Sequence, residues 1–203
     1  MEKTSKWNTI DGHSPVVSFF NSISTLSAEA VKTFDKHTFP LTVEKQKLVL
    51  RPGSTADHFY FIVKGVMRGY IKEEGKSITT WIIAENDIVG SIRTLGTDNN
   101  ICVEYLQALE NCELVAIPIA TTEYVFNKFP ETNVIGRRIW EFNYKSAEQR
   151  AYICRIPAAE KRYLQFLKSY PHLLDRISLK YIASFLGMTL ETLSRIRSRQ
   201  NKS

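Results

Sequence analysis

The stretch SLKYIASFLGMTLETLSRIRSR, residues Ser178 to Arg199, carries the clearest pattern in the chain. Its apolar residues form two short helical faces: Leu179, Ile182, Ala183 and Leu186, then Leu193 and Ile196. Gly187 lies between them, where the first helix must end and the chain must turn through a left-handed backbone. We expect Thr189 to cap the second helix, with Glu191 in its first turn. This pattern predicts a helix-turn-helix.

The second helix presents polar residues away from its apolar stripe: Thr189, Glu191, Thr192, Ser194, Arg195, Arg197 and Arg199. A helix that lies in the major groove of DNA needs short polar side chains and arginine on its outer face. A solvated helical hairpin would show the same glycine and apolar spacing. The arginine-rich end is therefore what favours a DNA-binding motif.

Charge is distributed unevenly along the 203 residues, whose net charge is +6. From Arg150 onward there are eleven Lys and Arg against three Asp and Glu, so this part carries +8 and the preceding part −2. This basic C-terminal part contains the predicted helix-turn-helix, which indicates a polyanionic partner. A solvated basic helical domain is the alternative.

Composition excludes several classes of protein. The hydrophobic content of 43% and charged content of 24% are typical of a globular protein. No window approaches the roughly 18 apolar residues of a membrane span, and the first residues do not resemble a signal peptide. Cys102, Cys112 and Cys154 lack metal-ligand spacing, so we expect no metal site and a reducing cytoplasm. We find no nucleotide-binding glycine loop, nucleophile elbow or paired-histidine motif, and expect no enzyme activity.

The rest of the chain predicts three parts. Residues 15–38 read as short helices, with Ser27 as an N-cap. The segments 43–50, 58–65, 66–72, 77–84 and 113–118 are rich in β-branched and aromatic residues and are separated by turn residues, which predicts an antiparallel roll. The expected boundaries are 1–120 for a sensor domain, 121–156 for a long helix, and 157–203 for the helix-turn-helix domain.

The long helix carries a repeat of four and three residues. We expect its seam to pair with a twin across a dimer axis, or else to pack on its own sheet; it consists of Ile135, Ile139, Phe142, Ser146, Gln149 and Ile153. Pro157 should interrupt the helix and open the next one, and is the candidate hinge.

A β-roll, a long helix and a helix-turn-helix, in this order, resemble the cyclic AMP receptor and fumarate–nitrate regulator (CRP/FNR) superfamily. The resemblance rests on LRPGSTADHFYFIVKGVMRGYI in the roll, and on EKRYLQFLKSYP with LKYIASFLGMTLETLSRIRS in the rear. It implies an α+β fold whose roll is a cyclic-nucleotide-binding-like jelly roll. It also implies a homodimeric transcription regulator, with RNA polymerase as a further partner.

The resemblance places an effector pocket around Gly90, Ser91, Ile92, Arg93, Cys102, Val103 and Ser146. Members that bind cyclic nucleotides use a glutamate for the ribose and an arginine with a hydroxyl residue for the phosphate. Ser91, Cys102 and Val103 stand at these positions, and none can neutralise a phosphate. We therefore expect no cofactor and no cyclic AMP bound in the family's manner. Another small-molecule effector, acting from this roll, stays open.

In the recognition helix the resemblance gives Leu190, Glu191 and Arg195 the base-reading positions. Glu191 could accept from cytosine and Arg195 could read guanine, and Leu190 in place of arginine should change the half-site. Arg197, Arg199, Lys202 and Lys180 are expected to contact phosphates. The leading hypothesis is a homodimeric regulator that reads a two-fold symmetric DNA site. The alternative is a ligand-sensing module whose C-terminal helices bind a protein partner.

Overall fold

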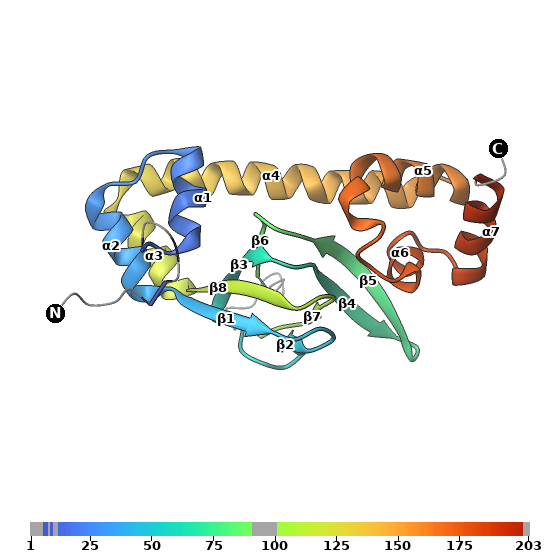
Figure 1. The fold of residues 1–203 in the computed structure, drawn as a ribbon, viewed down its shortest axis with the longest axis horizontal. Helices are drawn as coiled ribbons and strands as arrows, with labels where there is room; N and C mark the ends of the chain where they lie inside the picture. Colours follow the sequence, from blue (N-terminus) through green and yellow to red (C-terminus); the bar gives the residue numbers. More distant parts are fainter. Residues whose placement is uncertain (1–5, 8, 10–11, 91–100, 201–203) are drawn as a thin grey trace.

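The computed structural model describes residues 6–7, 9, 12–90 and 101–200. A β-roll lies beneath a layer of helices, and the longest helix runs along the roll to a small helical unit at the far end (Figure 1). The helices are α1 Pro15–Ile23, α2 Ala28–His37, α3 Ile119–Lys128, α4 Pro130–Arg155, α5 Ala159–Ser169, the 3-10 turn η1 Pro171–Leu173, α6 Leu179–Phe185 and α7 Leu190–Gln200.

The roll consists of two antiparallel four-stranded sheets, with strand orders β1-β8-β3-β6 and β2-β7-β4-β5. The strands are β1 Phe39–Val43, β2 Leu48–Leu50, β3 His58–Lys64, β4 Met67–Glu73, β5 Lys76–Ile83, β6 Ile88–Val89, β7 Tyr105–Ala108 and β8 Cys112–Pro118. The α+β fold class and its roll, long helix and helix-turn-helix are confirmed.

Two details of the strand prediction are wrong. The segment 43–50 is not one strand, because the chain turns between β1 and β2 with Gln46 at φ 69°. Strands β6 and β7 were not expected, since they have only two and four residues. The first helical region ends at His37, and Pro40 lies inside β1, at the sheet edge where a strand tolerates proline.

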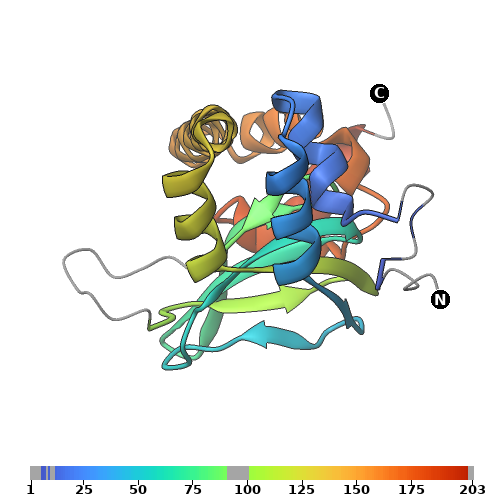
Figure 2. The same cartoon turned by 90° about the vertical axis from the view of Figure 1, so that its left-hand side faces the viewer.

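Alternation along the strands divides the apolar residues between two cores. Tyr60 and Ile62 of β3 face the space between the sheets, where Trp81 and Leu106 are also buried. Phe61 points to the other side and packs with α1, α2, α3 and the start of α4. These helices cover one outer face of the roll, as the end view shows (Figure 2).

A third apolar core joins the helix-turn-helix unit, residues 159–200, to the end of the roll. Phe166, Ile182, Leu186 and Leu193 of that unit are fully buried, together with Val66, Ile82, Ala84 and Leu109 of the roll and Ile153 of α4. Because one cluster contains residues of both parts, the unit is docked on the roll rather than attached by the chain alone.

Candidate nucleic-acid interface

The turn between α6 and α7 has the geometry that its glycine predicts. Gly187 adopts φ 61°, and the amide of Met188 donates to the carbonyl of Ala183 over 3.0 Å. Ile182, Ala183, Leu186, Leu193 and Ile196 are buried, as the sequence predicts, and Leu179 is half-buried. The side chain of Thr189 accepts from the amide of Thr192 over 3.2 Å, which confirms it as the cap. The helix-turn-helix is thus formed by the expected residues.

The outer face of α7 is exposed. Thr189, Leu190, Glu191, Ser194, Arg195 and Arg199 are all exposed, and so is Lys180 on α6. Arg197 differs, because it is half-buried. Burial raises the pKa of Tyr163 in α5, and the nearby charge of Arg197 opposes this rise. Lys202 lies outside the described residues. The pKa of Glu191 is lowered by its own amide, by Thr189 and by Arg195, so this carboxylate is ionised.

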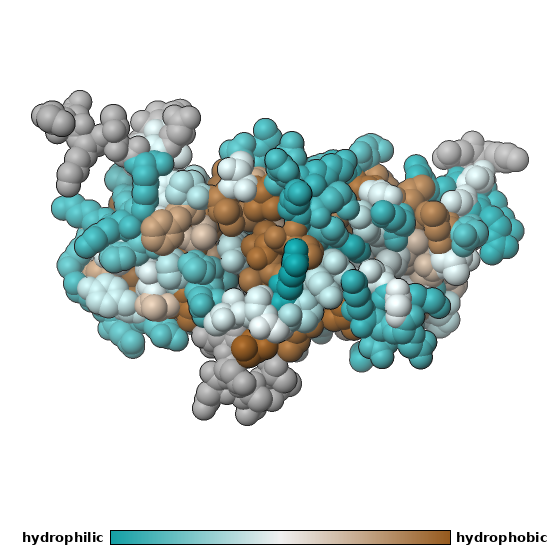
Figure 3. All heavy atoms as spheres, turned by 90° about the horizontal axis from the view of Figure 1, so that it is seen from below, coloured by the Kyte–Doolittle hydropathy of each residue, from teal (hydrophilic) through white to brown (hydrophobic). Residues whose placement is uncertain are grey.

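Sequence reasoning missed a groove beside this face. A concavity of about 310 Å³ lies between the start of α5 and α7, lined by Ala158, Ala159, Glu160, Thr192, Arg195, Ile196 and Arg199. Two of its residues are arginines already proposed for DNA contacts. The sequence holds no pattern for it, because α5 and α7 are distant in the chain and meet only in the fold. In Figure 3 hydrophilic atoms dominate this end of the molecule, and apolar atoms gather over the roll.

Residues 156–158 join α4 to α5 in a closed hairpin. The guanidinium of Arg162 donates to the carbonyls of Ile156 and Pro157 over 2.8 and 3.3 Å, and Gln149 of α4 donates to Ser169 of α5 over 2.6 Å. Helix α5 begins at Ala159, so Pro157 does not open it as expected. Pro157 lies between the two helices, and its role as a hinge stays a prediction.

The expected seam along α4 needs correction. Ile135 and Ile153 are 3% and 0% exposed and lie in cores of their own chain, and Ile139 packs against one of these cores. They cannot pair with a twin, because the roll and the helical unit already cover them. Phe142 and Gln149 are exposed, and Ser146 is half-buried.

A different stripe of α4 faces outward. Trp140, Tyr144, Ala147, Ala151 and Cys154 follow the same spacing of four and three residues, and all are exposed, Trp140 to 69% and Tyr144 to 70%. Small and aromatic residues at this spacing are typical of a helix that pairs with another helix. The sequence contains both stripes, and the folded chain buries Ile135 and Ile153 at the two ends of the first.

The interior of the roll holds a carboxylate. Glu104 is 2% exposed, and both its oxygens lie 3.2 Å from the indole nitrogen of Trp81, which donates to them. Thr80 donates to the same side chain over 3.2 Å. A carboxyl group at this place supplies no positive charge with which to balance a phosphate. Glu104 was missed because the resemblance pointed only to the two residues before it.

The described residues expected in an effector pocket lie in different surroundings, and the pocket itself stays a prediction. Cys102 is buried and its thiol donates to the carbonyl of Glu104 over 2.8 Å, whereas Val103 is 42% exposed and points away from the interior. Gly90 lies against the ring of Phe59, too close for a Cβ atom. Ser91, Ile92 and Arg93 lie outside the described residues.

Comparisons with known proteins agree with this architecture. Residues 40–129 match the cyclic nucleotide-binding domain family. The chain is 24% identical to the regulatory protein HlyX of Actinobacillus pleuropneumoniae, over 79% of this chain and 71% of that protein. It is 28% identical to the global nitrogen regulator of Nostoc sp., but the match covers 48% of this chain and only 44% of that regulator.

Solved structures share the fold. FixK2 from Bradyrhizobium japonicum superposes with a TM-score of 0.69 at 19% identity, over 81% of this chain and 85% of that one. CLP of Xanthomonas campestris, a c-di-GMP responsive global regulator, superposes with a TM-score of 0.68 at 17% identity, over 87% of this chain and 92% of that one.

The fold and the matched domain define a class of protein in which a nucleotide-binding-type roll is joined by a long helix to a helix-turn-helix. The chain is similar in sequence and fold to regulators of the CRP/FNR superfamily, and its residues 40–129 match the cyclic nucleotide-binding domain family. Among the described residues, no helix is both long and apolar enough to cross a membrane.

Proposed function

We propose that this chain is a cytoplasmic, DNA-binding transcription regulator that reads a two-fold symmetric site as a homodimer. The observation that carries the proposal is the outer face of α7, where Glu191, Ser194 and Arg195 are exposed on a helix fixed by a buried stripe. Carboxylate, hydroxyl and guanidinium groups on such a helix match base edges in the major groove. The three parts 1–120, 121–156 and 157–203 serve as sensor, dimer helix and DNA reader.

Selection from a pool of random DNA duplexes tests the reading face. Arg195→Ala should change the selected sequence, because a guanidinium that contacts guanine discriminates by roughly 1–3 kcal/mol. Arg199→Ala, the matched control, should weaken binding to all sequences alike and reduce the salt dependence. If wild-type protein enriches no sequence, the DNA-binding proposal fails and the alternative of a protein partner is favoured.

The dimer is proposed to form through the exposed stripe of α4. Ala147→Glu introduces a charge at the centre of this stripe and should give a monomer in sedimentation, since a small apolar contact becomes a pair of buried carboxylates. Phe142→Glu is the matched control, because Phe142 is 56% exposed and belongs to the seam that the sequence alone predicts. A monomer from Phe142→Glu and a dimer from Ala147→Glu would contradict the proposal.

The regulator is also proposed to act without cyclic AMP. The buried carboxylate of Glu104 and the thiol of Cys102 offer no positive charge to a cyclic phosphate. Calorimetry with cyclic AMP and cyclic GMP should therefore show no binding at micromolar concentrations. Micromolar or tighter binding of either nucleotide would overturn this part of the proposal.

A further inference from the structure

Three turns of the roll meet at the end that faces the helix-turn-helix unit. Gly65 lies in the turn from β3 to β4, Glu85 in the turn from β5 to β6, and Glu110 in the turn from β7 to β8. The amide of Gly65 donates to the carboxylate of Glu85 over 2.7 Å, which fixes the position of that side chain. Gly65 adopts φ 106°, and a Cβ atom there would lie 2.6 Å from the sulfur of Cys112. The two glutamates form what we call the acidic notch.

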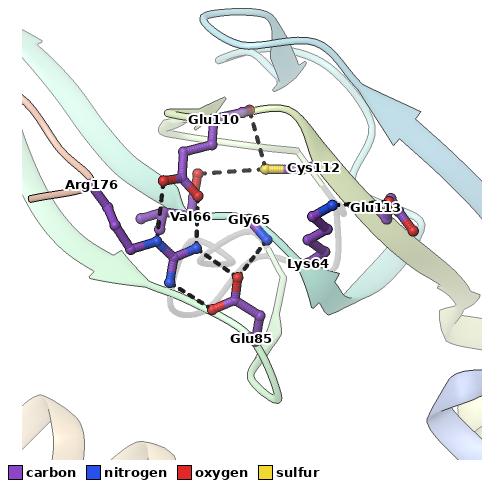
Figure 4. Close-up of polar contacts among 8 residues, drawn as sticks. All are labelled: Lys64, Gly65, Val66, Glu85, Glu110, Cys112, Glu113 and Arg176. Atoms are coloured by element: carbon purple, nitrogen blue, oxygen red, sulfur yellow. Dashed lines mark hydrogen bonds and ion pairs between the residues drawn. The ribbon is translucent and has the colours of Figure 1, made fainter. Parts of the chain in front are cut away.

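Arg176 enters the acidic notch from the helix-turn-helix unit (Figure 4). Its guanidinium donates to both oxygens of Glu85, over 2.6 and 2.9 Å, and to both oxygens of Glu110, over 2.7 and 3.1 Å. The three side chains are only 27–30% exposed. The guanidinium holds the pKa of Glu85 at about 2, and the two carboxylates raise the pKa of Arg176. A guanidinium that donates two hydrogen bonds to each of two carboxylates fixes the positions of all three groups far better than an exposed ion pair does.

A second contact fixes the same unit on the edge strand of the roll. The amide of Thr79 in β5 donates to the hydroxyl of Ser184 over 2.9 Å, and that hydroxyl donates to the carbonyl of Ser77 over 3.0 Å. The guanidinium of Arg68 lies 4.0 Å from the ring centre of Tyr181 in α6. All these contacts use α6 and the residues before it. Helix α7 contributes only its buried stripe to the shared apolar core, so docking leaves its outer face exposed.

We propose that the acidic notch holds the helix-turn-helix unit in the orientation that reads DNA, and that Arg176 is a positioning residue for DNA binding. The inference rests on the proposed function. In a dimer, two units must present α7 at a separation of about 34–36 Å, one turn of DNA. A unit that is released from the roll still binds one half-site, but it loses the advantage of two linked contacts.

The decisive variant changes the roll and leaves the DNA-binding unit intact. Glu85→Gln with Glu110→Gln removes two negative charges from the notch. A purely electrostatic effect would strengthen DNA binding, because the protein becomes more positive. Loss of positioning would weaken it, because the apparent affinity falls with the fraction of docked units. The two explanations therefore predict opposite signs.

The probes are a duplex selected by the wild-type protein and the same duplex with one half-site scrambled. We expect the double variant to bind the intact duplex about tenfold more weakly and the half-site duplex with unchanged affinity. Arg176→Lys should fall between wild type and the double variant, since lysine keeps the charge but lacks the fork. Lys64→Gln is the control, because Lys64 pairs with Glu113 at 3.9 Å on the same end of the roll without touching the unit.

Hydrogen exchange at the amide of Thr79 reports docking independently of DNA, because its acceptor is Ser184 of the docked unit. The double variant should exchange faster at this amide. Faster exchange with equal or tighter binding to the intact duplex would overturn the proposal, and so would unchanged exchange. If the wild-type protein selects no DNA at all, the proposed function fails, which is a separate result.

Discussion

The helix-turn-helix unit and the β-roll bury different kinds of residue. Among the described residues from 159 to 200, every buried side chain is apolar, and Phe166, Ile182 and Leu193 form the centre. The roll buries Arg68, Thr79 and Glu104 as well. Arg68 is held by Gln107 over 2.9 Å and by Thr79 over 3.0 Å, from two neighbouring strands. The interior of the helix-turn-helix unit is therefore held together by apolar packing, whereas the interior of the roll also needs hydrogen bonds between side chains of neighbouring strands.

The largest expected change in the free energy of unfolding tests the apolar core of the helix-turn-helix unit. Phe166→Ala should lower the free energy of unfolding by about 3–5 kcal/mol, because Phe166 is fully buried at the junction of α5, α6 and the roll. Leu164→Ala on the same helix is the control, since Leu164 is 48% exposed and should change stability by no more than about 0.5 kcal/mol. Unfolding in urea measures both, and similar losses would contradict the assigned core.

The next effect tests packing inside the roll. A Cβ atom at Gly69 would lie 2.2 Å from the ring of Trp81, whose indole donates to Glu104. Gly69→Ala should therefore cost about 1–3 kcal/mol by overpacking. The same substitution in a Trp81→Leu background should cost less, because the smaller side chain leaves room. Equal costs in the two backgrounds would show that the ring does not limit this position.

The smallest effect concerns a partly buried charge where the roll meets α4. Burial raises the pKa of Asp87 to about 6, although Arg150 lowers it. The folded state therefore prefers the protonated acid, and this contribution to stability is present below about pH 4 and is lost as the pH rises through 6. Asp87→Asn should match wild type near pH 4 and be more stable than wild type at pH 8, by about 1 kcal/mol once the roughly 3 kcal/mol of a two-unit pKa shift is discounted for partial exposure. Unfolding at both values measures this, and Asp175→Asn, an exposed acid of the reading unit, should show no such difference.

Sequence reasoning succeeded where neighbours in the chain decide the structure. Gly187, Thr189 and the stripe through Leu193 are read from spacing alone, because one helical turn sets their contacts. The sequence-based prediction was wrong where residues distant in the chain decide which side chains are buried. Ile135 and Ile153 have the right spacing for a dimer seam, but nothing near them shows that the roll and the reading unit will cover them.

The same reason explains what the sequence left out of the roll. Glu104 gives no pattern by which its contact with Trp81 could be inferred, since 23 residues separate them. In the sequence Arg176 is one of eleven basic residues after position 149, and only the fold brings it to Glu85, 91 residues away. Both are polar side chains that act through distant partners, and spacing carries no information about such partners.

The hydroxyl of Ser184 has a consequence for how the chain can be divided. Strand β5 is an outer strand of its sheet, and Ser184 occupies one of its amides and one of its carbonyls. A fragment that ends before α5 would leave this strand open to another copy of itself, and open strands of this kind favour association between molecules. Cutting the protein at residue 156 is thus expected to yield a roll fragment that self-associates, because the helix-turn-helix unit no longer covers β5.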